Sequence, residues 1–150
     1  MKTVLWILFL MGSLYAESFD NYLKRFDYNE RTEMKIKSLE AVELYKSGEV
    51  EFVDIRFKEE QAVWSFPFMK KIPLNELPNR LNELDKNKTI VTVCPHYDRA
   101  EIARLYLTLH GYKSRYLTDG LIGLAGYLRG DEAKEFIEET KKHDAHFLTN

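Results

Sequence analysis

The sequence predicts an α/β fold in one domain, with a central parallel sheet covered by helices on both faces. Two patterns indicate it. A β-branched run at residues 89–93 and further strand candidates at 50–55 and 113–117 alternate with stretches in which apolar side chains recur at helical spacing. In addition, Arg56, Cys94 and Asp119 follow the ends of these runs. Ligands of parallel sheets bind outside the carboxyl ends of the strands, so a functional site is expected there.

Composition is that of a globular domain. The chain has 150 residues, of which 45% are hydrophobic and 31% are charged. The net charge is −2, and the lysines and arginines are spread along the chain. This distribution argues against a nucleic-acid partner.

Residues 1–16 are typical of a secretory signal peptide. Lys2 precedes an apolar run at residues 4–10, and residues 12–16 form the expected cleavage region. The run is shorter than the roughly 20 apolar residues that span a bilayer, so no stable membrane span is expected after cleavage. The protein is therefore expected in a periplasm or outside the cell. The alternative is an uncleaved anchor, because Leu14 is unusual two residues before a cleavage point.

Residues 17–32 form a predicted N-terminal helical extension. Ser18 is available as an N-cap, and four apolar residues follow at helical spacing: Phe19, Tyr22, Leu23 and Phe26. The competing interpretation is a disordered leader.

The predicted main domain, residues 33–130, begins with an edge strand at 34–37. Ser38 is expected to cap a helix that runs through Tyr45 and stops at Gly48. A central strand follows at 50–55. Residues 57–73 are then expected to be irregular and aromatic, before a helix at 76–84 that tolerates Pro78 in its first turn.

The second half of this domain repeats the alternation. A strand at 89–93 leads into a loop at Cys94 and a helix at 100–110 that Gly111 closes. Another strand, at 113–117, precedes a turn at Asp119-Gly120 and a weak helix at 121–129. Residues 131–150 are predicted to be a C-terminal helix, capped by Asp131, and a tail.

Cys94 is the only cysteine. It lies between a buried strand and the start of a helix, where unpaired N–H groups and the helix dipole stabilise a thiolate. A nucleophilic thiolate is therefore predicted, and this loop position argues against the alternative of a buried, inert thiol. In an oxidising compartment most cysteines are paired, but a single cysteine cannot form an internal disulfide.

Three segments together resemble the rhodanese-like domain, or sulfurtransferase, family. The first is residues 52–56 with Glu59-Glu60 downstream, and the second is residues 72–77. The third runs from the strand and the Cys94 loop to the Gly-Tyr pair at 111–112 and the turn at 117–120. The resemblance covers residues 34–129, and it implies the rhodanese-like fold and sulfur transfer through a cysteine.

The resemblance also assigns the active loop, which has six residues: Cys94, Pro95, His96, Tyr97, Asp98 and Arg99. A six-residue cradle of N–H groups fits a sulfur atom, whereas related phosphatases use one residue more to hold a tetrahedral oxyanion. The implied chemistry takes sulfane sulfur from thiosulfate, polysulfide or a protein persulfide. A Cys94 persulfide then passes it to a thiol or cyanide, and no cofactor is needed.

The loop also departs from the family pattern. Pro95 has no N–H to donate, the usual glycine is missing, and Asp98 opposes Arg99 in charge. A neutral polysulfide or a protein persulfide suits such a loop better than thiosulfate. The alternative function is a catalytically weak binding module that engages a protein through the N-terminal helix or the aromatic segment 63–69. For that segment, core and loop packing is the preferred interpretation over a partner-binding lid.

Asp54 and Arg56 are the other candidate site residues. They are expected to form an ion pair that braces the loop, and the alternative is that Arg56 contacts substrate. His96 either adjusts Cys94 or has no role. The remaining histidines, His110, His143 and His146, show no ligand spacing with the cysteine, so no metal site is predicted.

Overall fold

The computed structural model describes residues 16–141, and its centre is a parallel sheet of five strands. Their order is β1-β5-β4-β2-β3, and every neighbouring pair is parallel, as predicted. The longest pairing joins β2 to β4, where five residues of each strand are in register. The strands are β1 (Lys35–Ile36), β2 (Val50–Asp54), β3 (Lys70–Lys71), β4 (Thr89–Val93) and β5 (Ser114–Leu117).

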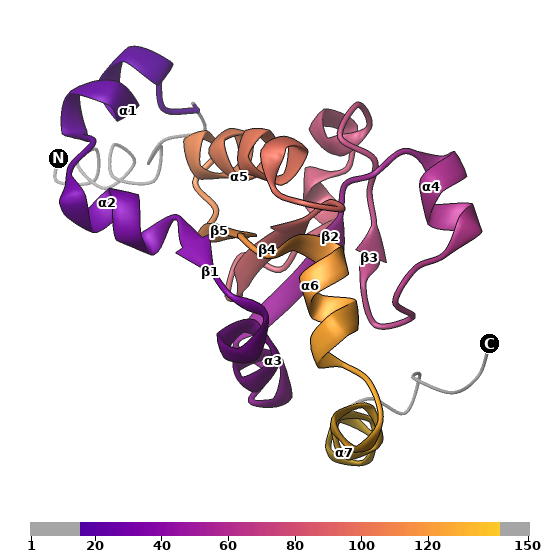
Figure 1. The fold of residues 1–150 in the computed structure, drawn as a ribbon. Helices are drawn as coiled ribbons and strands as arrows, with labels where there is room; N and C mark the ends of the chain where they lie inside the picture. Colours follow the sequence, from indigo (N-terminus) through magenta and orange to yellow (C-terminus); the bar gives the residue numbers. More distant parts are fainter. Residues whose placement is uncertain (1–15, 142–150) are drawn as a thin grey trace, which may run out of the picture.

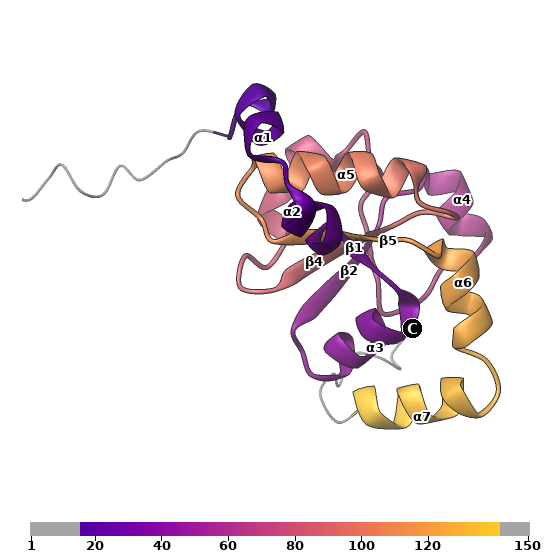
Figure 2. The ribbon, with the colours of Figure 1, turned by 60° about the vertical axis from the view of Figure 1, so that its left-hand side comes forward.

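Helices cover both faces of the sheet (Figure 1). On one face lies α5 (Asp98–Leu109), and on the other lie α3 (Ser38–Lys46), α6 (Gly120–Tyr127) and α7 (Asp131–Thr140). The same division is clear after rotation (Figure 2). The remaining helical elements are α1 (Phe19–Arg25), α2 (Tyr28–Glu33), α4 (Lys58–Val63) and the 3₁₀ turns η1 (Leu77–Asn79) and η2 (Leu81–Glu83).

The sheet therefore separates two apolar cores. Ala100, Ala103 and Leu107 of α5 pack on one side with Val53 and Ile90. The other core lies beneath α3, α6 and α7, and it includes Val42, Phe52, Val91, Leu121, Leu124 and Phe136. Alternate residues of β2 and β4 thus enter opposite cores, which explains why apolar residues stand next to each other in both strands.

The N-terminal extension is helical, but it consists of two helices. Ser18 caps α1 as predicted, its hydroxyl accepting a hydrogen bond from the Asn21 N–H at 3.2 Å. Asp27 then starts α2, where its carboxylate accepts from the Glu30 N–H at 2.8 Å. Of the four apolar residues at helical spacing only Tyr22 is buried, so most of that stripe faces outward.

Two segments between β2 and β4 differ from the prediction. The segment 57–73 is not wholly irregular, because it contains α4 and β3. The predicted helix at 76–84 is instead the two 3₁₀ turns η1 and η2. Arg80, between them, has a φ of −126°, which interrupts any continuous helix. Leu77 and Leu84 are nevertheless buried, so the spacing of leucines identified the right core residues but the wrong helix type.

Two predicted caps are also wrong. Lys37, not Ser38, precedes α3, and the Ser38 N–H donates to the Asp119 carboxylate at 3.1 Å. Gly130, not Asp131, precedes α7, with a φ of +56° that favours glycine. The predicted stop at Gly48 is confirmed, since its φ of +80° ends α3 in the left-handed conformation.

Some expectations fall outside the described residues. They are the signal sequence up to residue 15, the tail from 142 to 150, and the histidines His143 and His146. Within residues 16–141, none of the helices has the length and apolar character needed to cross a membrane.

Candidate active site

Cys94 lies at the carboxyl end of β4, at the place that the sequence indicates. The loop after it is short, because α5 begins at Asp98 and not at residue 100. Asp98 and Arg99 therefore belong to the first turn of α5, and Tyr97 stands at the N-cap position without a side-chain hydrogen bond to the helix. The strand and the helix together fix both ends of the loop.

Backbone hydrogen bonds from the start of α6 fix the position of the loop. The Leu121 N–H donates to the carbonyl of Cys94 at 2.9 Å, and the Ile122 N–H donates to the carbonyl of Pro95 at 3.4 Å. Gly120, with a φ of +61°, lies against the same peptide groups. A Cβ added there would stand 2.2 Å from the carbonyl oxygen of His96 and 2.3 Å from that of Pro95. Only glycine allows this approach.

With the carbonyls turned towards α6, N–H groups of the loop and of α5 are free to face the sulfur. The N–H groups of Ala100, His96 and Arg99 hydrogen-bond to Cys94 and favour its thiolate. Pro95 contributes no N–H, but its carbonyl is one of the two that α6 holds. Pro95 therefore lacks an N–H that could face the sulfur, but its carbonyl still anchors the loop to α6.

Burial opposes the thiolate and outweighs these N–H groups. Cys94 is fully buried, with an exposed fraction of 0%, so the expectation that its loop keeps it accessible is wrong. Its Sγ donates to Oδ1 of Asp98 at 3.6 Å. The pKa of Cys94 is raised above its ordinary value, first by burial and further by the negative charge of Asp98. The predicted lowering of this pKa is therefore also wrong.

Arg99 does not stand free beside the thiol. Its guanidinium forms two hydrogen bonds with the Glu60 carboxylate, at 2.6 and 2.9 Å, and it lies 5.8 Å from the ring of Phe57. Glu60 also accepts from the Phe57 N–H at 3.1 Å, which closes the first turn of α4. One carboxylate thus joins α4 to the active loop and balances the charge of Arg99.

Asp54 and Arg56 form the predicted ion pair, and it is completely buried. The guanidinium binds both carboxylate oxygens, with a shortest distance of 2.6 Å. It also donates to the carbonyl of Trp64 at 2.8 Å and lies 4.5 Å from the centre of that indole ring. Arg56 therefore holds the end of α4 and the aromatic segment in place. Gln61, also buried, adds hydrogen bonds to the carbonyls of Asp54 and Arg56.

The other loop residues face outward. His96 and Tyr97 are exposed, and no hydrogen bond of either side chain is found in the described residues. Asp119 lies after β5 as expected, but its carboxylate caps α3 and does not reach the thiol. Among residues 16–141, no group of three His, Cys, Asp or Glu side chains is arranged to hold a metal ion.

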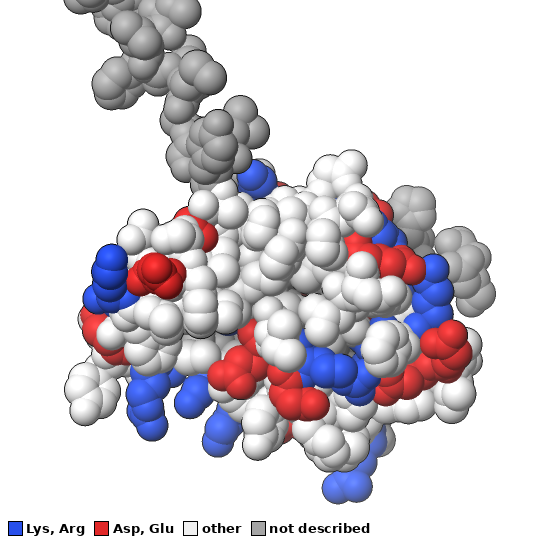
Figure 3. All heavy atoms as spheres, turned by 90° about the horizontal axis from the view of Figure 1, so that it is seen from above, with Lys and Arg blue, Asp and Glu red and all other residues white. Residues whose placement is uncertain are grey.

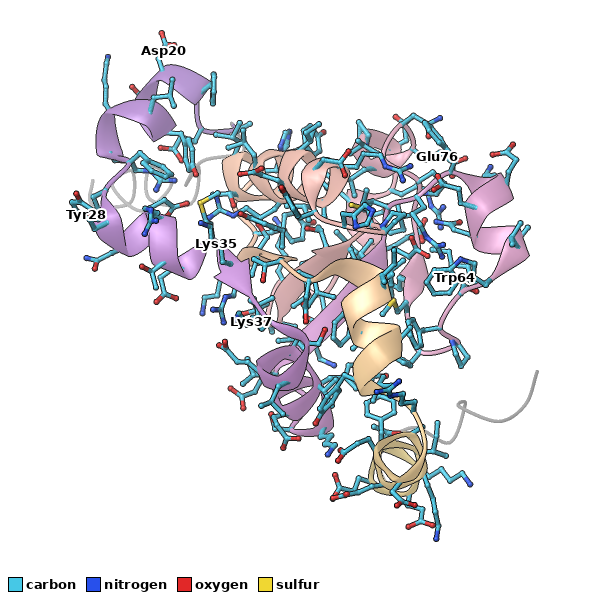
Figure 4. All side chains as sticks on the ribbon, in the orientation of Figure 1. Asp20, Tyr28, Lys35, Lys37, Trp64 and Glu76 are labelled. Atoms are coloured by element: carbon cyan, nitrogen blue, oxygen red, sulfur yellow. The ribbon has the colours of Figure 1, made fainter. Side chains whose placement is uncertain are left out.

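A pocket of about 280 Å³ opens beside Pro95. Trp64 stands on the side of the molecule where α4 and α6 face each other (Figure 4). The walls are mostly apolar. The two charged residues among them are Arg56, which is paired with Asp54, and Glu60, which is paired with Arg99. The lining residues are Arg56, Glu60, Val63, Trp64, Pro95 and Ile122.

Sequence reasoning missed the roles of Glu60, Trp64 and Gly120. For Glu60, the available signal is the pair of acidic residues at 59–60, which is typical of a helix start. The partnership of Glu60 with Arg99 joins residues 39 positions apart, and no local pattern reveals it.

Comparisons with known proteins agree with this geometry. The Rhodanese-like domain family matches residues 38–123. A rhodanese-like domain protein from Staphylococcus aureus is 28% identical, with a TM-score of 0.56, covering 60% of this chain and 89% of its own. The protein SSP1007 from Staphylococcus saprophyticus is 27% identical, with a TM-score of 0.54, covering 65% of this chain and 94% of its own.

A third structure shares the fold at lower identity. The human single-domain sulfurtransferase is 20% identical, with a TM-score of 0.55, covering 62% of this chain and 96% of its own. No curated protein gives a significant match. The family match spans more than half of the chain and includes β2, β4, the Cys94 loop and the start of α6, so this protein belongs to the rhodanese-like domain family.

Proposed function

We propose that this protein is a sulfurtransferase that carries sulfane sulfur as a persulfide on Cys94. The observation that carries the proposal is the arrangement of three N–H groups, from His96, Arg99 and Ala100, around one sulfur at a strand end. A persulfide places its negative charge on an outer sulfur, and a cradle of N–H groups stabilises such an anion. Family membership supports the same reaction.

The reaction has two steps and needs no cofactor. The Cys94 thiolate attacks the outer sulfur of a donor such as thiosulfate, polysulfide or a protein persulfide, and the remainder of the donor leaves with the bonding electron pair. An acceptor thiolate or cyanide then attacks the outer sulfur of the persulfide and regenerates Cys94. Asp98, which accepts the hydrogen bond of the thiol, is positioned to take its proton before the first step.

An intact-mass measurement tests the proposal. The protein is incubated with thiosulfate and, separately, with polysulfide. We expect a gain of one sulfur atom that cyanide or a thiol removes and that Cys94→Ser abolishes. Tyr97→Phe, a change in the same loop that retains the thiol, should keep the adduct. A chain that gains no sulfur from any donor would contradict the proposal.

The second candidate is a binding module with little turnover. The complete burial of Cys94 and the absence of an unpaired arginine at the loop favour it. In that case Trp64 and its neighbours would engage a protein partner. The two candidates differ in the mass experiment, because a binding module would gain no sulfur while keeping the same fold.

We also propose that the protein is exported and loses residues 1–16. The apolar run at residues 4–10 and the cleavage region before Glu17 support this. Expression of the full chain in a bacterium with a periplasm should give a soluble periplasmic protein that begins at Glu17, as read by N-terminal sequencing. An Ala16→Arg variant should retain the leader. Recovery of the uncleaved chain in the cytoplasm would contradict export.

A further inference from the structure

The charges around Cys94 are unusual for a site that would take an anionic donor. The guanidinium of Arg99 is bound by Glu60, and that of Arg56 is bound by Asp54. The charged side chain that contacts the thiol itself is Asp98, at 3.6 Å. In the described part of the chain, a donor that reaches Cys94 therefore meets a carboxylate, and the nearby guanidinium charges are already balanced.

The pocket beside the loop is mostly apolar. Val63, Trp64, Pro95 and Ile122 form most of its wall, and the two charged residues in that wall are each paired. The side chains of Val63, Trp64 and Ile122 remain partly or largely exposed, so they gain by covering an apolar group. A hydrated anion gains nothing there, because it would lose water without finding a free cation.

We propose that Asp98 and this pocket select a sulfur donor of low charge that carries an apolar substituent, in preference to the thiosulfate dianion. The inference rests on the proposed function, since it names the donor class for the same thiol. Asp98 is the specificity-determining residue, because it repels a second negative charge on the donor. Val63, Trp64, Pro95 and Ile122 bind the apolar substituent.

Organic thiosulfonates, R–SO₂–S⁻, represent this class, and their reaction balances without an oxidant or reductant. The thiol proton passes to Asp98, and the thiolate forms a bond to the outer sulfur of the donor. The bond between that sulfur and the sulfonyl sulfur breaks, and its electron pair leaves with the sulfinate, R–SO₂⁻. The proton on Asp98 is then released to water, so the products are the anionic Cys94 persulfide, one sulfinate and one proton.

The experiment compares three donors that share the outer sulfur: thiosulfate, methanethiosulfonate and benzenethiosulfonate. The rate at which each adds sulfur to Cys94 is measured by intact mass, and it is divided by the rate of the same donor with N-acetylcysteine. This ratio removes the intrinsic reactivity of the donor. We expect this ratio to be about tenfold higher for benzenethiosulfonate than for thiosulfate, which corresponds to 1.4 kcal/mol, and to be intermediate for methanethiosulfonate.

Two variants with matched controls separate charge from apolar contact. Asp98→Asn should raise the rate of sulfur addition from thiosulfate severalfold relative to the rate from benzenethiosulfonate. Glu101→Gln removes the same charge one turn along α5 and should not change this ratio. Asp98→Glu keeps the charge and should keep the preference. Ile122→Ser should lower the rate of sulfur addition from benzenethiosulfonate but not the rate from methanethiosulfonate. Ile102→Ser is its control, since Ile102 is 59% exposed and Ile122 is 56% exposed.

Each outcome decides between the proposals. If Cys94 gains sulfur from thiosulfate as fast as from benzenethiosulfonate, donor selection is wrong and sulfur transfer stands. The same conclusion follows if Asp98→Asn and Glu101→Gln behave alike while both keep the native circular dichroism spectrum. If no donor adds sulfur, both the proposed function and this inference fail.

Discussion

Two opposing sets of interactions determine the protonation state of Cys94. Burial and the Asp98 carboxylate favour the neutral thiol, while the N–H groups of His96, Arg99 and Ala100 favour the thiolate. Because burial is the largest of these influences, the resting residue is a thiol. In the proposed reaction, the N–H groups are then best matched to the charge that appears on the sulfur during transfer, which is the condition for stabilising a transition state.

The raised pKa predicts how alkylation of Cys94 depends on pH. Alkylation requires the thiolate, and a raised pKa keeps the thiol protonated to higher pH. The rate with iodoacetamide should therefore rise with pH to a midpoint above that of a free cysteine, about 8.5. Asp98→Asn should move the midpoint down, because it removes a charge that disfavours the thiolate, and Glu101→Gln should leave it nearly unchanged. A midpoint below that of free cysteine would contradict this account.

Gly120 is the second residue on which the site depends. A Cβ at this position would collide with the carbonyl oxygens of Pro95 and His96, and the φ of +61° disfavours any other residue. Gly120→Ala should therefore displace the loop and reduce sulfur addition to Cys94 by at least tenfold, measured by intact mass.

The control for this change lies in the same helix. Gly126 has an ordinary φ and an open position, with no atom within 4 Å of an added Cβ. Gly126→Ala should keep sulfur addition and raise stability by up to about 1 kcal/mol, as expected for alanine within a helix. Equal loss of activity in both variants would show that α6 does not position the loop through Gly120.

At the scale of elements, the β5–α6 connection supports both the loop and α3. Its backbone N–H groups bind the loop carbonyls, and the Asp119 carboxylate accepts from the Ser38 N–H. The hydroxyl of Ser38 is buried and has no hydrogen-bond partner in the described residues. The cap of α3 is therefore supplied by a residue 81 positions away, not by the serine at its start.

This assignment predicts opposite results for two alanine variants. Asp119→Ala removes the cap of α3 and should lower the free energy of unfolding by about 1 kcal/mol. Ser38→Ala removes an unpaired buried hydroxyl and should leave that free energy unchanged or slightly higher. Urea unfolding of both variants measures the difference. A larger loss from Ser38→Ala would restore the sequence-based assignment of the cap.

At the scale of the whole molecule, the N-terminal extension is attached through Arg104 of α5. This buried guanidinium is paired with Glu30 of α2, and it donates to the hydroxyl of Tyr22 at 2.8 Å. The face that carries α5 is largely uncharged in its middle (Figure 3). Exposed Phe19 and Leu23 of α1 lie with Ile102 around a groove of about 390 Å³ on that side.

Removing the partner of Arg104 should loosen the extension. Glu30→Gln leaves a buried guanidinium without its carboxylate, so we expect a loss of about 2 kcal/mol in the free energy of unfolding. Hydrogen exchange should increase in α1 and α2. Glu17→Gln removes the exposed partner of Arg25 and should change stability little. If the two variants are equally stable, the Arg104 pair does not hold the extension.

Much of this protein could be predicted from local sequence. The alternation of residues 50–55, 89–93 and 113–117 with helical stretches predicted the parallel sheet, and the position of Cys94 predicted its place at a strand end. These inferences succeed because strands and helices each give a characteristic spacing of apolar residues within a short segment of the chain. The glycine stop at Gly48 is equally local.

Only the tertiary structure decided the chemistry of the site. The burial of Cys94, the pairing of Arg99 with Glu60 and the contact of Gly120 with the loop join residues distant in the chain. The pKa of a thiol depends on burial and on the charges that surround it in space, and neither follows from its neighbours in sequence. The sequence alone thus determined which residue is the candidate nucleophile and where it lies, and the packing around it decided its burial and the direction of its pKa shift.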